Sequence, residues 1–210
     1  NYLDGLRTTK IVMTGSVPSI PITSVNIPVI SLPGMSGFSV GNNSALIGGT
    51  AIAALQNCNG YWIFTTLKKT TGELLLTVFS LTTTGLSYSS SIILPSSIVN
   101  YEKISIAPNG NRIIYGNNNF SDLLMFDFDK FSGILSNQKS LLTYPQSTTE
   151  NGEFSSDSNL FYTSDLSQNL YQFNLNAINP FLNKKIVSTS LINRAIKRGP
   201  DGKIYFMDAN

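Results

Sequence analysis

The chain has 210 residues, of which 41% are hydrophobic, 10% aromatic and 12% charged, and its formal net charge is +2. The hydrophobic content excludes a disordered chain, and the near-neutral charge excludes the strongly basic surface of a nucleic-acid binder. The sequence has no histidine and one cysteine, Cys58, which excludes an internal disulfide, a Ser-His-Asp triad and a histidine-ligated zinc site.

The first 40 residues are irregular. Residues 8–16 and 24–32 predict two strands, and Pro18, Pro21, Pro28 and Pro33 suit edge or connecting segments rather than central strands. No apolar run approaches the roughly eighteen residues of a membrane span, so we expect none. The chain begins without a methionine and ends inside a strand-like run, so we expect it to be a fragment of a longer protein.

From residue 45 onward, short runs rich in Ile, Val, Thr, Tyr and Phe alternate with Gly, Asn, Ser and Pro clusters, which predicts strands and no helix. The candidate strands are 45–55, 61–67, 73–81, 102–107, 112–116, 122–128, 159–163, 169–175, 184–189, 194–198 and 203–208.

A polar turn followed by an aromatic strand recurs along the chain, as in "APNGNRIIYG", "SSDSNLFYTS" and "GPDGKIYFMD". Alignment of these turns places Asn59, Asn109, Asp157 and Asp201 in register, 44 to 50 residues apart. Such turns join antiparallel strands where a residue must adopt positive φ. Four strands in each such interval is the period of a β-propeller blade.

We therefore predict an all-β fold, a partial propeller with four-stranded antiparallel blades of the WD40-like or YncE-like type. One blade cannot cover both of its faces, so neighbouring blades must stack around an axis. The expected organisation is a single partial propeller over 1–210, with the end of a preceding blade or an irregular connector at 1–40, blades at 41–98, 99–146 and 147–191, and the start of another at 192–210.

Asp127 and Asp129 are the first candidates for chemistry, because alternation places both on one strand face, about 6–7 Å apart. They could form a carboxylate pair or part of a calcium site, although the EF-hand pattern fails at Ser132 and Gln138. The alternative interpretation, which we favour, is that Asp129 organises the turn to Ser132 and Gly133.

Glu150 and Glu153 lie at the start of a blade, whose inner strand lines the central channel, and Glu153 is a further candidate metal ligand. The favoured interpretation is that they are solvated channel residues or partners of nearby lysines or arginines. Arg194, Lys197, Arg198 and Lys203 could bind an acidic partner or glycan carboxylates, or could be a solvated strand and turn, which we favour.

Three smaller features have ordinary structural interpretations. Tyr61 and Trp62 could stack on a sugar ring, but their strand position favours a core between blades. Residues 116–119 resemble a metal- or sugar-binding loop only loosely, and we expect a blade loop. We expect Cys58 to be a small buried or half-buried residue.

The segment 104–135 resembles the propeller units of large surface proteins that the type IX secretion system of Bacteroidetes exports, often described as gliding-motility-associated. The matching positions are Leu124, Phe128, Asp129, Gly133 and Leu135. The stretches "GEFSSDSNLFYTSDLSQNLYQFNL" and "KRGPDGKIYFMDAN" are similar to units of the same family, so the resemblance covers residues 57–210. It implies a secreted, cell-surface location and a binding or scaffolding role, and it assigns no catalytic residue.

We therefore predict a noncatalytic secreted or cell-surface module that binds a protein or glycan, or acts as a scaffold in adhesion or gliding, with no enzymatic activity. One alternative is a propeller enzyme of the lactonase or glycan lyase type that uses axial carboxylates and a metal. Another is a structural subunit of a cell-surface or secretion complex. Without histidine, an all-oxygen site for calcium is the candidate cofactor site. The expected partners are other domains of the same longer chain, a secretion-complex subunit, or a protein or glycan.

Overall fold

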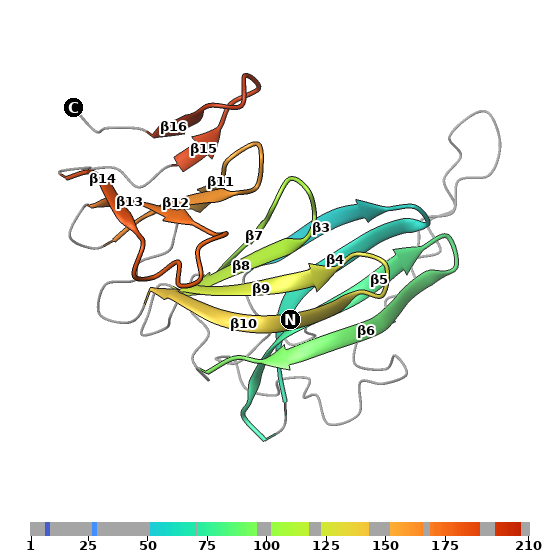
Figure 1. Ribbon diagram of the computed structural model, residues 1–210. Coiled ribbons are helices and arrows are strands. Elements are labelled where there is room, and N and C mark those ends of the chain that lie inside the picture. The colour runs from blue at the N-terminus through green and yellow to red at the C-terminus, as the bar shows by residue number, and fades with distance from the viewer. Residues whose placement is uncertain are drawn as a thin grey trace, which may run out of the picture.

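Figure 1 shows the computed structural model of the chain, which is built from β-sheets that follow one another in sequence order. The structure describes residues 7–8, 27–28, 51–69, 71–95, 102–117, 123–142, 152–165, 169–189 and 196–206. Within these ranges no helix has the length and apolar content needed to cross a membrane.

Each sheet is an antiparallel meander in which strands adjacent in sequence are neighbours in space. The first sheet has the order β3 (Ile52–Asn57), β4 (Gly60–Lys68), β5 (Leu74–Thr82) and β6 (Gly85–Ile93). The second has the order β7 (Glu102–Ile106), β8 (Arg112–Asn117), β9 (Leu123–Asp129) and β10 (Ile134–Leu142).

The third sheet repeats this plan, and two short pairs of strands complete the description. The third sheet has the order β11 (Gly152–Phe154), β12 (Leu160–Ser164), β13 (Leu170–Asn174) and β14 (Lys185–Ser188). The short pairs are β15 (Ile196–Arg198) with β16 (Ile204–Phe206), and β1 (Arg7–Thr8) with β2 (Ile27–Pro28). The expected strands 8–16 and 24–32 otherwise lie outside the described residues.

The sheets stack face to face, because their middle strands are apolar on both faces. In β8, Ile113 and Tyr115 pack in the core between the first and second sheets, whereas Ile114 packs between the second and third. Successive side chains of a strand point to opposite faces, so an uninterrupted apolar run serves two interfaces. Leu170 on β13 and Ile196 on β15 form a smaller core between the third sheet and the pair of strands β15 and β16.

The first strand of each sheet contacts the first strand of the next, in the series β3, β7, β11 and β15. This series is the inner edge of a set of sheets that fan around an axis, as the cyan-to-red progression in Figure 1 shows. The prediction of an all-β partial propeller with four-stranded antiparallel blades is therefore confirmed.

The recurring turns hold their shape through one side-chain contact. The side chains of Asn109, Asp157 and Asp201 accept a hydrogen bond from the backbone N–H two residues later, at 3.0 to 3.1 Å. The next residue has positive φ in each turn: 74° at Gly110, 64° at Ser158 and 79° at Gly202. Such an Asx contact supplies a local partner for the backbone where the chain reverses.

The first turn departs from this register. Asn57, not Asn59, is the acceptor there, and it receives the N–H of Asn59 at 2.8 Å. Asn57 pairs directly with Gly60, so this hairpin closes in two residues while the others use a longer turn. The predicted equivalence of Asn59 with the other three turn residues was therefore wrong.

Ser158 is the one non-glycine residue among the three positive-φ turn positions, and its packing explains why. It is buried, and its hydroxyl accepts the N–H of Asn109 at 3.1 Å, while its carbonyl accepts a bond from Arg112 at 3.4 Å. The turn of the third sheet is thus bonded to the turn of the second, so hydrogen bonds as well as apolar contacts fix the angle between neighbouring sheets.

Candidate functional site

Asp127 and Asp129 are engaged with different partners on β9. Asp127 is half-buried and accepts a bond from the side-chain amide of Asn137 at 2.8 Å. Asn137 has a φ of 51° at a register shift in β10, and this bulge directs its amide to the carboxylate. Asp129 is exposed and accepts the Ser132 hydroxyl at 2.6 Å and the Phe131 N–H at 2.9 Å.

These contacts of Asp129 have an electrostatic consequence. The Ser132 hydroxyl, and then the Phe131 N–H, hold the pKa of the Asp129 carboxyl below its ordinary value. The two aspartates line one open hollow of about 400 Å³, together with Arg112, Asn159 and Asn176. A role of this pair in metal binding stays a prediction. Among the residues that the structure describes, no group of three or more His, Cys, Asp or Glu side chains lies close enough to hold a metal ion.

Charged residues of three successive inner strands interact near the axis: Lys103 on β7, Glu153 on β11 and Lys197 on β15. The Lys103 ammonium donates to the carbonyl of Gly152 at 3.1 Å, directly beside Glu153. Burial lowers the pKa of Lys103 and the charge of Lys197 lowers it further, whereas Glu153 acts in the opposite direction.

Gly152 permits this close approach between the second and third sheets. A Cβ at Gly152 would overlap the ring of Phe161 on β12, which is buried in the core between those sheets. Glycine therefore leaves room for the Phe161 ring beside the inner strand whose carbonyl accepts the Lys103 ammonium.

Only part of this axial group could be found from the sequence. Glu153 was considered because it begins a unit, and Lys197 was grouped with Arg198 and Lys203, but Lys103 was missed. Lys203 instead lies 3.6 Å from Asp201 in its own turn. The signal for Lys103 was a lysine inside the otherwise strand-like run "EKISI". Glu150 and Arg194 lie outside the described residues.

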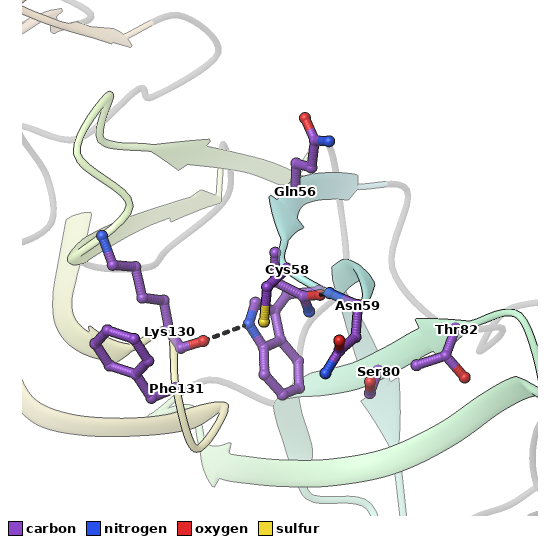
Figure 2. A pocket seen from close by; sticks show the side chains of 9 residues that line it. Gln56, Cys58, Asn59, Ser80, Thr82, Lys130 and Phe131 are labelled. Atoms are coloured by element: carbon purple, nitrogen blue, oxygen red, sulfur yellow. Dashed lines mark hydrogen bonds between the residues drawn. The ribbon is translucent and has the colours of Figure 1, made fainter.

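A second concave region lies between the first and second sheets, at the turns after β3 and β9 (Figure 2). Its volume is about 510 Å³, and Trp62 lines it. Trp62 is 8% exposed and packs edge-on to Phe128 at 6.0 Å, so its predicted place in the core between blades is correct. Tyr61 is 46% exposed, so its predicted place in that core is wrong. Cys58 is exposed, so the prediction that it is buried or half-buried is also wrong.

No protein-family model matches the chain, and no curated protein matches it. Solved structures do resemble it. A putative 6-phosphogluconolactonase from Bacteroides fragilis has a TM-score of 0.45 at 13% identity, covering 65% of this chain and 39% of that one. A gluconolactonase from Xanthomonas campestris has a TM-score of 0.45 at 10% identity, covering 78% and 55%.

A third similar structure is described as the calcium-binding protein regucalcin from Agrobacterium tumefaciens. It has a TM-score of 0.40 at 10% identity, and the match covers 75% of this chain and 66% of that one. The present chain thus spans between 39% and 66% of the length of these three structures.

These comparisons correct two predictions, the noncatalytic binding or scaffolding module and the absence of enzymatic activity. Two of the three similar structures are described as lactonases, which is a description of those proteins. At 10–13% identity the likeness itself concerns only the fold. The resemblance to exported Bacteroidetes surface proteins stays a prediction.

Proposed function

We propose that this chain forms part of a propeller enzyme that hydrolyses an ester or lactone of an anionic, sugar-derived substrate at the axis. The observation that carries the proposal is the convergence of Lys103, Glu153 and Lys197 from three successive inner strands. Two cations and one carboxylate beside a central channel can bind an anion and also move a proton.

Lys103 supports this assignment because its environment is unusual for a lysine. It is half-buried, it donates to a backbone carbonyl, and its pKa is lowered by burial and by Lys197. Groups with perturbed pKa values concentrate at functional sites, although structural ion pairs produce them as well. Here the perturbed group also lies beside a carboxylate on the neighbouring inner strand.

The proposed chemistry assigns a separate role to each group. Glu153 accepts a proton from water as the water oxygen attacks the acyl carbon. The acyl C–O bond then breaks, and Glu153 returns the proton to the leaving alkoxide. The Lys103 ammonium stabilises the negative charge that develops on the carbonyl oxygen. The Lys197 ammonium binds the carboxylate or phosphate of the substrate.

The described axial residues do not fit calcium. That ion takes six to eight oxygen ligands, whereas the one carboxylate here interacts with the Lys103 ammonium, and a backbone N–H already donates to Glu153 Oε1 at 3.2 Å. None of the proposed steps therefore uses a metal. Calcium binding stays a prediction, and calorimetric titration of the chain with calcium chloride tests it.

The test of the enzymatic proposal is a pH-stat assay with a phosphorylated aldonolactone and a neutral aldonolactone. We expect turnover above the uncatalysed rate, with preference for the phosphorylated substrate. Glu153→Gln should lower kcat at least about a hundredfold, and Lys197→Met should mainly raise KM. Lys185→Met, an exposed change on β14, is the matched control for removal of a lysine.

Two results would overturn the enzymatic proposal: no rate above the uncatalysed reaction with either lactone, or unchanged kinetics in Glu153→Gln. The cell-surface location and the exported-protein context are separate proposals that rest on the resemblance of residues 57–210. Protease accessibility of the protein on intact cells tests them, and full protection would reject a surface location.

A further inference from the structure

The concave region of Figure 2 lies away from the axial charges and is formed by two tight turns and the strands beside them. Asn57, Cys58 and Asn59 come from the turn between β3 and β4, and Lys130 and Phe131 come from the turn between β9 and β10. Its volume of about 510 Å³ is within the range of small-molecule sites.

Two aromatic side chains give this pocket its apolar surface. The Trp62 indole Nε1 donates to the carbonyl of Lys130 at 2.8 Å, which fixes the ring against the turn of the second sheet. Phe131, at the tip of that turn, is 87% exposed. Its only ring contact among the described residues is the Lys130 ammonium, 6.0 Å from the ring centroid, so most of the ring is open to a ligand that would cover it.

The remaining lining is polar and uncharged. Side-chain amides of Gln56, Asn57 and Asn59 and hydroxyls of Ser80 and Thr82 border the space. The side-chain oxygen Oδ1 of Asn57 accepts the backbone N–H of Asn59 at 2.8 Å, so the turn orients the Asn57 side-chain amide. A fully apolar ligand would leave these groups without partners, which makes its binding unfavourable.

Lys130 is the single charged residue among the described residues of the lining, and its ammonium lies over the Phe131 ring, 6.0 Å from the ring centroid. It donates to the carbonyl of Asn109 at 3.4 Å, and Figure 2 shows the side chain extending away from Cys58 and Asn59. Because no acidic side chain of the described residues lines the pocket, a cationic ligand would lose hydration without gaining an ion pair. The Lys130 ammonium, which already donates to the Asn109 carbonyl, is the one charge that an anionic ligand could meet.

We propose that this pocket binds a neutral saccharide. A sugar ring presents an apolar face that suits Phe131 and Trp62, and hydroxyls that suit the amides and hydroxyls of the opposite lining. The proposal is independent of the axial chemistry, because binding here involves none of the axial residues and requires no turnover.

The chain carries its own reporters for this test. Trp62 is its one tryptophan and Cys58 its one cysteine, and both line the pocket. Titration with cellobiose, maltose and lactose should give a saturable change in tryptophan emission with at least one of them. The same disaccharide should slow the reaction of Cys58 with a thiol reagent, and calorimetry should give the same affinity.

Phe131→Ala is the decisive variant, because an exposed side chain can be truncated without loss of folding. We expect it to weaken saccharide binding about tenfold, with an unchanged circular dichroism spectrum. Phe206→Ala, a half-exposed phenylalanine on β16 in a different sheet, is the matched control and should bind as the unaltered chain does.

Three results would overturn the proposal. The first is no saturable binding of any of the three disaccharides up to tens of millimolar. The second is equal affinity in Phe131→Ala and the unaltered chain. The third is tighter binding of glucuronate, or of an uncharged nucleoside, than of the best disaccharide, since these would identify an anionic or a planar aromatic ligand instead.

Discussion

Two threonines that face each other across β4 and β5 differ in their hydrogen bonding. Thr65 and Thr77 are directly paired, and both are buried. The Thr65 hydroxyl donates to the carbonyl of Ala51 at 3.1 Å, whereas the Thr77 hydroxyl has no hydrogen-bond partner among the described residues. A buried hydroxyl without a partner destabilises the folded state.

This pair gives a prediction at the scale of single residues. Thr77→Val should raise the free energy of unfolding by about 1 kcal/mol, because it removes an unpaired polar group at nearly constant volume. Thr65→Val should lower it by a similar amount, because it removes a satisfied bond and leaves the Ala51 carbonyl without this donor. Urea denaturation measures both variants, and equal effects of the two changes would contradict the prediction.

At the scale of structural elements, the recurring turn depends on an ionised carboxylate in two of its copies. The Ser155 hydroxyl and the Asn159 N–H lower the pKa of Asp157 from its ordinary 3.8, and the Tyr205 hydroxyl and Lys203 N–H lower that of Asp201. Because the folded pKa is depressed, these carboxylates contribute stability that is fully present above about pH 4 and is lost as the pH falls through the folded value.

Asn109 occupies the equivalent place in the second sheet and does not titrate, so the chain contains its own comparison. Asp157→Asn should reduce the fall in unfolding free energy between pH 5 and pH 2, and Asn109→Asp should increase it, since each turn would keep its bond to the following N–H. Denaturant melts across this range measure the slope. The same slope in all three proteins would contradict the role of the turn carboxylate.

At the scale of the whole molecule, we expect each interface between neighbouring sheets to stabilise mainly the two sheets that form it. The two largest core clusters each join two adjacent sheets, as in repeat architectures whose units contact only their neighbours. Phe161 is buried in the cluster between the second and third sheets and packs edge-on against Phe154 at 5.0 Å.

Phe161→Ala should cost about 3–5 kcal/mol at this interface. The resulting loss of protection from hydrogen exchange should be larger in β8 and β12, on the two sides of the cluster, than in β4 of the first sheet. Exposed Phe131→Ala is the control and should leave the exchange pattern unchanged. Equal acceleration in β4 would show that the sheets unfold as one unit and would contradict the prediction.

The strands were predictable from the sequence because their signals are local. Apolar runs mark β4, β8, β9 and β12, and an Asn-Gly or Asp-Ser turn comes directly before β4, β8 and β12. The spacing of these turns then implied the blade. β10 was not recognised, because the polar run "SNQK" interrupts it, and its bulge at Asn137 can be seen only against its partner β9. The short length of the first turn, which makes Asn57 the hydrogen-bond acceptor, could not be predicted from the sequence either.

The candidate sites depended on tertiary structure, because each joins residues from different sheets. Lys103 interacts with Glu153 and Lys197 only through the stacking of three inner strands, and Trp62 meets the turn at Lys130 across a sheet interface. Local sequence determines whether a segment is a strand and which residues alternate along it. The distance between side chains of different sheets depends on how their apolar faces pack, and only the folded chain decides that.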